Sequence, residues 1–172
     1  MDDEIEILEE VRSPNSEIFR KFWGAGEWDD ESDFLCFKYK GYVCSLGRCL
    51  GEMSENCFSG FLCGYMTVPK THRLYDGKDW GKQWLDLDVH GGITYCEMRG
   101  DDFVLGFDCA HHNDMIPGMK TFQEKHLERF MNLYKDLNYK PSKTVYRNLQ
   151  YVINNCKHLV DQVIELDSKD ER

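Results

Sequence analysis

Histidine and aspartate side chains suited to acid–base chemistry gather in two short segments of the sequence. His90 lies in the first segment, and Asp108, His111 and Asp114 lie in the second. An imidazole beside a carboxylate can act as a general acid or base near neutral pH, because the carboxylate fixes the tautomer and orientation of the ring. We therefore take these four as the candidate catalytic residues. His111 is expected to be the general acid or base, and Asp108 its orienting carboxylate.

Residues that suit an anionic ligand accompany the histidines. Gly91 and Gly92 follow His90, and glycines allow backbone amides to approach a phosphate or an oxyanion closely. Together with His90, these amides are expected to stabilise phosphate charge. A basic and aromatic loop, residues 70–75, suits an anionic ligand that carries a ring. The candidate ligand-binding residues are His72, Gly91, Gly92, Thr94, Tyr95 and His112.

Other catalytic chemistries have weaker support in the sequence. Histidine and carboxylate ligands suit zinc or manganese, but no recognised ligand spacing is present, so a divalent metal stays open and no metal or other cofactor is assigned. Cys109 adjoins Asp108, yet neighbouring residues of a strand face opposite ways, so the thiol is expected to point inward. A Gly-x-Ser-x-Gly elbow, a Gly-x-Gly-x-x-Gly loop and a Walker loop are all absent from the sequence.

Alternating and fully apolar runs predict the strands that would position these side chains. The strand over residues 85–89 would end at His90, and the strand over residues 103–108 would end just before His111. If these two strands are neighbours, the catalytic candidates converge on one edge of a sheet. Further strands are predicted over residues 34–39 and 42–46, joined by a hairpin turn at residues 40–41, and over residues 60–68 and 93–97.

After residue 117 the apolar residues have helical spacing. A moderate helix is predicted over residues 121–137 and a strong one over residues 142–166, with its apolar positions on one face. Strands followed by packing helices indicate the α+β class. We expect one domain over residues 34–172, an antiparallel or mixed sheet of about five strands packed by C-terminal helices.

The acidity of the chain is concentrated at its N-terminus. The formal net charge is −10, and residues 1–33 hold 12 acidic but only 3 basic side chains. Ile5, Leu8 and Val11 have helical spacing, a second short helix is expected up to Trp23, and residues 27–33 are interpreted as a linker. This acidic segment is expected to be a solvated arm, or alternatively to dock on a basic host surface. The nearly neutral remainder has no basic stripe, which makes nucleic-acid binding unlikely on physical grounds.

Length and composition favour a cytosolic globular protein. The chain has 172 residues, of which 41% are hydrophobic, and it contains neither an apolar run of about 18 residues nor a signal-like start. Its eight cysteines are expected to be free thiols in a reducing compartment, most of them in the core, with Cys49 and Cys57 exposed. The sequence predicts no membrane contact and leaves both a monomer and a homo-oligomer open.

Several motifs resemble an uncharacterised family of phage-encoded proteins. The resemblance rests on the His-Gly-Gly-x-Thr-Tyr motif at residues 90–95, the Gly-Phe-Asp-Cys-Ala-His motif at residues 106–111, and the segments 62–69 and 146–152. It covers residues 37–165 and excludes the acidic segment. Arg73 departs from the family, in which a proline is usual at this position.

The resemblance implies a phage or prophage context. A small phage accessory protein is expected to act against host defence in the host cytoplasm, where many defences signal through nucleotides. We therefore expect a nucleotide-like phosphate ligand at the His/Asp site. If the site is catalytic, the protein would be a phosphodiesterase-like hydrolase. The alternatives are a protein that sequesters a nucleotide signal without cleaving it, and an interaction protein that binds a host defence protein through residues 1–33.

Overall fold

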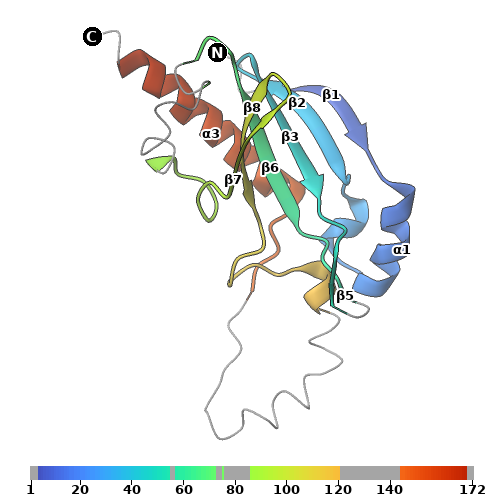
Figure 1. The fold of residues 1–172 in the computed structure, drawn as a ribbon. Helices are drawn as coiled ribbons and strands as arrows, with labels where there is room; N and C mark the ends of the chain where they lie inside the picture. The colour runs from blue at the N-terminus through green and yellow to red at the C-terminus, as the bar shows by residue number, and fades with distance from the viewer. Residues whose placement is uncertain (1–3, 55–56, 73–74, 76–85, 121–143, 170–172) are drawn as a thin grey trace, which may run out of the picture.

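A six-stranded antiparallel sheet forms the centre of the fold in the computed structural model, which describes residues 4–54, 57–72, 75, 86–120 and 144–169 (Figure 1). The strand order is β1-β2-β3-β6-β8-β7, and α3 lies across one face of the sheet. The predicted α+β class is confirmed, with six strands where about five were expected. The strands are β1 (Glu6–Val11), β2 (Phe34–Tyr39), β3 (Tyr42–Arg48), β6 (Leu62–Val68), β7 (Tyr95–Arg99) and β8 (Asp102–Asp108), with a separate pair β4 (Glu52–Ser54) and β5 (Cys57–Phe58); the helices are α1 (Pro14–Trp23), the short 3-10 helix η1 (Glu27–Asp30) and α3 (Leu149–Lys169).

The β2–β3 hairpin turns where the sequence predicts it. Lys40 and Gly41 both have positive φ angles, 49° and 86°, which is the backbone conformation of a two-residue type I′ turn. Alternate residues of β2, β3 and β6 then point toward α3 and form the main core with the apolar face of that helix. Fully buried members of this core include Phe37, Leu46, Leu62, Met66, Phe107, Val152, Leu159 and Val163.

Helix α3 starts later than the apolar pattern predicts. The side-chain oxygen of Asn148 accepts a hydrogen bond from the Tyr151 amide (2.9 Å), which is an N-cap, and the helix begins at Leu149. Residues 144–148 are therefore not helical, whereas the helix was expected from residue 142. The other predicted helix, residues 121–137, lies outside the described residues.

The strand predicted over residues 85–89 is wrong for residues 86–89, which lie outside the sheet. Leu87 and Val89 are buried and Asp88 is exposed, so the alternation of the sequence is real. However, the N–H and C=O groups of Asp88 both bond to the side-chain amide of Gln162 on α3, at 2.8 Å each. The backbone of this segment forms its hydrogen bonds with a helix instead of a neighbouring strand. The alternation of apolar residues in the sequence does not distinguish these two cases.

The N-terminal segment contains a strand where a helix was expected. Residues 6–11 form β1, an edge strand that pairs with β2, so the helical interpretation of Ile5, Leu8 and Val11 is wrong. Helix α1 begins at Pro14, because Ser13 caps it and proline suits the first helical position.

Two acidic residues of this segment, Glu31 and Asp33, are buried rather than solvated. Glu31 and Asp33 pair with Arg48, whose side chain is fully buried, at 2.7 and 3.0 Å. Tyr146 accepts a hydrogen bond from Arg48 and donates one to Glu31, and Arg20 pairs with Asp33 at 2.6 Å. These five residues are called the Arg48 network below. They fasten β3, α1 and the segment before α3 together, so a solvated arm is the wrong description of residues 31–33.

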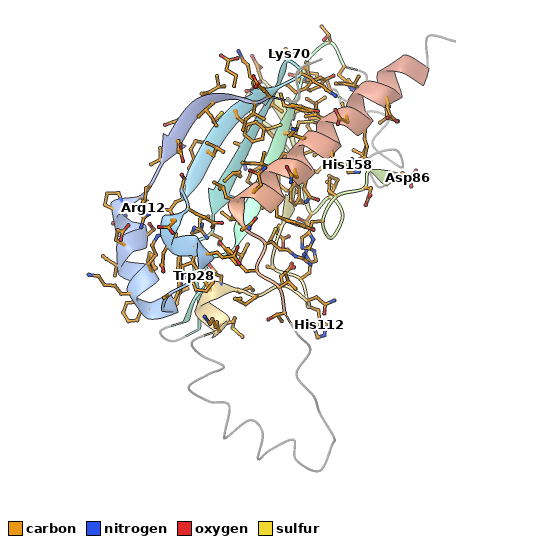
Figure 2. All side chains as sticks on the ribbon, turned by 180° about the vertical axis from the view of Figure 1, so that it is seen from behind. Arg12, Trp28, Lys70, Asp86, His112 and His158 are labelled. Atoms are coloured by element: carbon orange, nitrogen blue, oxygen red, sulfur yellow. The ribbon has the colours of Figure 1, made fainter. Side chains whose placement is uncertain are left out.

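Trp28 adds apolar contacts to the same end of the sheet. It is 1% exposed and packs edge-to-face on the ring of Tyr146, with centroids 5.2 Å apart. Figure 2 shows Trp28 beside α1, at the end of the molecule remote from Lys70. The predicted linker therefore contributes a large side chain to a second, smaller core.

The seven cysteines whose side chains are described are free thiols, as predicted, but fewer of them are buried than expected. Cys44, Cys109 and Cys156 are buried, whereas Cys36, Cys49, Cys63 and Cys96 are partly exposed. No helix within the described residues is both long and apolar enough to span a membrane.

Candidate functional site

Two loops bring histidines to the end of β8. The first contains His90, whose backbone N–H donates to the side-chain oxygen of Asn155 on α3 (3.0 Å). The second follows β8 and is closed on itself, because the amide of Asp114 donates to the carbonyl of His111 (2.8 Å) while the Asp114 carboxylate accepts from the His111 amide (2.9 Å). Both loops are thus held by backbone hydrogen bonds.

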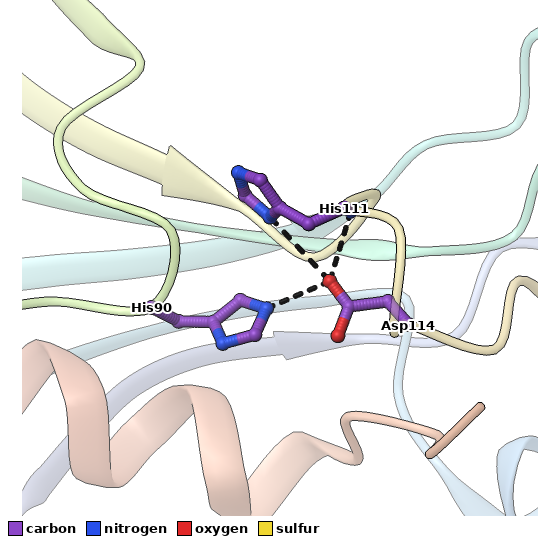
Figure 3. A group of neighbouring side chains, drawn as sticks. All are labelled: His90, His111 and Asp114. Atoms are coloured by element: carbon purple, nitrogen blue, oxygen red, sulfur yellow. Dashed lines mark hydrogen bonds and ion pairs between the residues drawn. The ribbon is translucent and has the colours of Figure 1, made fainter. Parts of the chain in front are cut away.

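Asp114 is the centre of the site. Its Oδ2 atom lies 2.7 Å from Nε2 of His90 and 3.4 Å from Nδ1 of His111 (Figure 3). The two imidazole rings meet edge-to-face, with centroids 5.2 Å apart. The Asp114 side chain is 1% exposed, whereas that of His111 is 35% exposed. Three of the four predicted catalytic residues therefore converge, and His111 is the member that reaches solvent.

Gly91 makes room for this arrangement. A Cβ atom at this position would lie 2.0 Å from Cε1 of His111, and the backbone has a φ of 70°, which favours glycine. The glycine is therefore required by the packing of the His111 ring. The amide of its neighbour Gly92 donates to the carbonyl of Val89 (3.0 Å) and is used by the turn.

Arg147 and Tyr151 complete the site. Nε of Arg147 donates to Oδ1 of Asp114 (2.9 Å), and its guanidinium lies over the ring of Tyr151. The hydroxyl of Tyr151 is 3.0 Å from Nδ1 of His90. These five residues are called the His90 cluster below: His90, His111, Asp114, Arg147 and Tyr151.

Sequence reasoning missed Arg147 and Tyr151. Both lie in the helix predicted from residue 142 and in the segment 146–152 of the family resemblance, but neither was assigned to the site. A signal was present, because Arg147 and Tyr151 are four residues apart just before and within the first turn of α3. A cation and an aromatic ring at this spacing can share one face of a helical end.

Asp114 stays ionised in this setting. Burial raises the pKa of its carboxyl, but hydrogen bonds from His90, Arg147 and the His111 amide outweigh that effect and lower the pKa below its usual value. The carboxylate in turn raises the pKa of Arg147. One negative charge is therefore surrounded by one permanent cation and two imidazoles.

Asp108 borders the cluster but does not orient His111 directly. Its Oδ1 atom is 4.0 Å from Nδ1 of His111, farther than Asp114. Its carboxylate accepts hydrogen bonds from the hydroxyl of Thr94 (2.8 Å) and the amide of Ala110 (3.1 Å). Asp114 is thus the carboxylate nearest to the ring of His111, and it holds this residue through the His111 amide, whereas Thr94 reaches the site only through Asp108.

The remaining predicted ligand-binding residues have other partners or surroundings. His72 is buried, with Nε2 3.2 Å from the carbonyl of Val163, which is 12 residues or about 18 Å along α3 from Tyr151. His112 is exposed. The hydroxyl of Tyr95 donates to Glu97 and accepts from Arg99, at 2.8 Å each.

Cys109 does not serve as a nucleophile at this site. It is 2% exposed and belongs to the main core, as the alternation of the strand predicts. Burial is the largest of the influences that raise the pKa of its thiol, and nearby Asp114 raises it further. The thiolate that a nucleophile requires is therefore disfavoured.

Comparisons with protein-family models, with curated protein sequences and with solved structures find no match for this chain. The phage-family resemblance thus stays a prediction, and the function has to be argued from the geometry of the site.

Proposed function

We propose that the His90 cluster binds the phosphate group of a nucleotide-like ligand. The observation that carries this proposal is the excess of nitrogen donors over carboxylates. His90, His111 and Arg147 all surround the single carboxylate of Asp114, and the carboxylate already accepts hydrogen bonds on both oxygens. The donors that remain unused by Asp114 are available to a further anion.

Arg147 is the expected anchor for the phosphate. Only its Nε atom is committed to Asp114, and its side chain is 24% exposed, so the terminal nitrogens of the guanidinium can form a charge-assisted pair with phosphate oxygens. His111 presents its other ring edge, with Nε2, away from Asp114 (Figure 3). A phosphate between these two groups would meet a cation and a donor.

The same geometry supports hydrolysis of a phosphate ester as the chemistry of the site. Water would attack phosphorus, the P–O bond to the leaving group would break, and His111 would give its Nε2 proton to the leaving oxygen. The attacking water keeps one proton on the new P–OH group and loses the other to solvent, and solvent returns a proton to Nε2 of His111. Asp114 would act as a positioning residue, because it holds the ring of His111 through the loop that it closes.

The phage context supplied by the resemblance extends this proposal. In that setting the protein would be an accessory protein that acts against host defence in the host cytoplasm, and its ligand would be a nucleotide signal. Cleavage and sequestration of that signal both require the His90 cluster, and they differ only in whether a product forms.

A nucleotide challenge tests the proposal. The purified protein is incubated with linear, cyclic and ADP-ribose-type nucleotides, filtered and heat-denatured, and both fractions are analysed by chromatography. A new product in the filtrate indicates an enzyme, and an intact nucleotide released only by heat indicates sequestration. Nucleotides that all pass through unchanged would contradict the proposal.

Matched variants locate the activity. Arg147→Gln should weaken retention or turnover by about 10–100-fold, the usual effect of losing hydrogen bonds to a charged group. His158→Ala serves as the control, because this exposed histidine pairs with Asp88 and belongs to another part of α3. Equal loss in both variants would contradict a site at Arg147.

An interaction role for the N-terminal segment has its own supporting observation. Strand β1 is an edge strand, all six of its residues are exposed, and three of them are glutamates. An unpaired acidic edge suits an extended basic segment of a host protein. Replacing Glu6, Glu9 and Glu10 by glutamine should abolish such binding while leaving nucleotide retention unchanged.

A further inference from the structure

One atom of the His90 cluster has an unsatisfied bonding capacity. Nδ1 of His111 is buried and has no hydrogen-bond partner among the described residues, although Oδ2 of Asp114 is only 3.4 Å away. A buried polar atom without a partner is unfavourable and calls for a physical explanation. Here the atom faces a carboxylate and a second imidazole, which are the usual ligands of a transition metal.

We propose that Nε2 of His90, Nδ1 of His111 and Oδ2 of Asp114 bind a divalent transition-metal ion, for which Zn²⁺ is the best match. One ligand atom from each of these three residues lies within 4.8 Å of the other two. The site uses the cluster of the proposed function, but it does not depend on the phosphate ligand. With the ion on its Nδ1 atom, His111 would be a metal ligand, and solvent instead of His111 would supply the proton of the leaving group.

The distances suit a metal after a small adjustment. In a tetrahedral zinc site with bonds of about 2.0–2.2 Å, neighbouring donor atoms lie about 3.3–3.6 Å apart. The separation of Asp114 Oδ2 from His111 Nδ1 is 3.4 Å. Its separation from His90 Nε2 is 2.7 Å, because a proton now lies between these two atoms. The metal would replace that proton and widen the gap.

Outer hydrogen bonds already orient two of the three ligands. The Tyr151 hydroxyl lies 3.0 Å from Nδ1 of His90, so it can accept a proton there and leave Nε2 free to bind the ion. Arg147 holds Oδ1 of Asp114 and leaves Oδ2 toward the two histidines. Such support by surrounding residues is typical of protein metal sites.

The donor set also indicates the class of metal and its use. Two imidazole nitrogens and one carboxylate oxygen suit zinc, manganese or iron better than calcium or magnesium, which prefer oxygen ligands alone. Three protein ligands leave at least one position open. A phosphate oxygen or a water molecule could occupy it, next to the guanidinium of Arg147.

Titration of the chelator-treated protein with Co²⁺ as a spectroscopic probe tests the proposal. One Co²⁺ per chain should bind and give a visible absorption band, and Zn²⁺ should displace it. The chain has eight cysteines, so the spectrum must also separate nitrogen and oxygen ligands from thiolates. A thiolate-to-cobalt charge-transfer band would place the ion at cysteines and overturn the proposal, and so would the absence of binding.

Variants make the test specific to the three ligands. His111→Ala and His90→Ala should each abolish the visible band at equal protein and metal concentration. Tyr151→Phe keeps every ligand and should weaken Co²⁺ affinity by about 10–100-fold, the range for loss of an outer hydrogen bond. His158→Ala is the matched control and should bind Co²⁺ like the parent protein. Unchanged affinity in His111→Ala would overturn the proposal.

Thermal unfolding shows whether the variants are folded, and together with nucleotide retention it separates the metal site from the proposed function. Zn²⁺ should raise the melting temperature of the parent protein, since an ion that binds only the folded state stabilises it, and should leave His111→Ala unchanged. Metal binding without nucleotide retention would support the metal site and contradict the proposed function. Nucleotide retention by a metal-free protein that binds no Co²⁺ would support the proposed function and contradict the metal site.

Discussion

The Arg48 network and the His90 cluster contain similar groups but differ in how far their side chains are exposed to solvent. Each combines a guanidinium, a tyrosine hydroxyl and buried carboxylate. In the network, all three nitrogens of Arg48 donate hydrogen bonds to protein groups, and Nη1 of Arg20 is its one atom without a partner among the described residues. In the cluster, the side chain of His111 is 35% exposed, and its Nδ1 atom has no hydrogen-bond partner among the described residues.

This difference separates a structural role from a functional one. A buried ionic group whose partners all come from the protein stabilises the arrangement of the chain and has no capacity left for a ligand. A group that is held in position but whose hydrogen-bonding capacity is not fully used by the protein can still bind a ligand. We therefore expect substitutions in the network to affect stability first, and those in the cluster to affect binding first.

The largest effect on stability is expected for Arg48→Met. The variant leaves Glu31 and Asp33 buried without their central cation, which should lower the free energy of unfolding by about 3–5 kcal/mol. Urea denaturation measures the change. Arg12→Ala removes an exposed pair with Glu17 and should lower the free energy by less than about 1 kcal/mol. Similar losses in the free energy of unfolding for the two variants would contradict a structural role of the network.

Two neighbouring glycines test the position of the His111 ring in the cluster. Gly91→Ala and Gly92→Ala share the strain of a positive φ angle, which costs about 1–2 kcal/mol. Only the Gly91 variant also forces its Cβ into the His111 ring, so it should lose a further 1–3 kcal/mol or so, together with ligand binding. Apart from its chain neighbours, no atom of the described residues lies within 4 Å of a Cβ at Gly92. Equal stability and binding in the two variants would contradict the position of His111.

Acid should weaken both regions through their aspartates. Burial raises the pKa of Asp33, but hydrogen bonds from Ser16 and Ser13 and the charges of Arg20 and Arg48 lower it overall, and the pKa of Asp114 is lowered too. A carboxyl with a lowered pKa in the folded state contributes stability that is fully present above its unfolded value near 3.8 and is lost as the pH falls through the lower folded value.

Urea denaturation of single variants between pH 2 and pH 7 checks this expectation. Asp33→Asn and Asp114→Asn should each be less stable than the parent at neutral pH, and the difference should shrink as the pH falls below about 4. A difference that stays constant over this range would show that the ionised carboxylate is not the stabilising form.

Within the cluster, the smallest effect on stability is expected for His111→Ala. Nδ1 of His111 makes no hydrogen bond among the described residues, and the ring is partly exposed, so its removal should change the free energy of unfolding by no more than about 1 kcal/mol. Nucleotide retention should nevertheless be lost. A loss comparable to that of Arg48→Met would place His111 among the structural residues.

The sequence predicted elements whose patterns depend on local contacts. The β2–β3 hairpin follows from alternation and a turn at Lys40 and Gly41, and α3 follows from one apolar face. Strand β1 was missed because a register irregularity between Ile7 and Glu9 breaks the alternation and leaves apolar residues at helical spacing. Residues 86–89 were misassigned because Gln162 takes the place of a neighbouring strand.

The candidate site was predicted in part for the same reason. His111 and Asp114 share one loop, so their proximity follows from sequence distance alone. His90 was placed correctly although its predicted strand is wrong, because the turn after Val89 still ends beside β8. Arg147 is 33 residues from Asp114, and only the folded chain brings them together.

Histidine NMR during a nucleotide titration tests the central claim most directly. With ¹⁵N-labelled histidines, addition of the pooled nucleotide panel should shift the ring signals of His90 and His111 and leave those of His72 and His158 in place, since His72 is bonded to the far half of α3 and His158 is exposed. Assignment comes from single substitutions. Shifts confined to histidines outside the cluster, or no shifts at all, would contradict a ligand site at the His90 cluster.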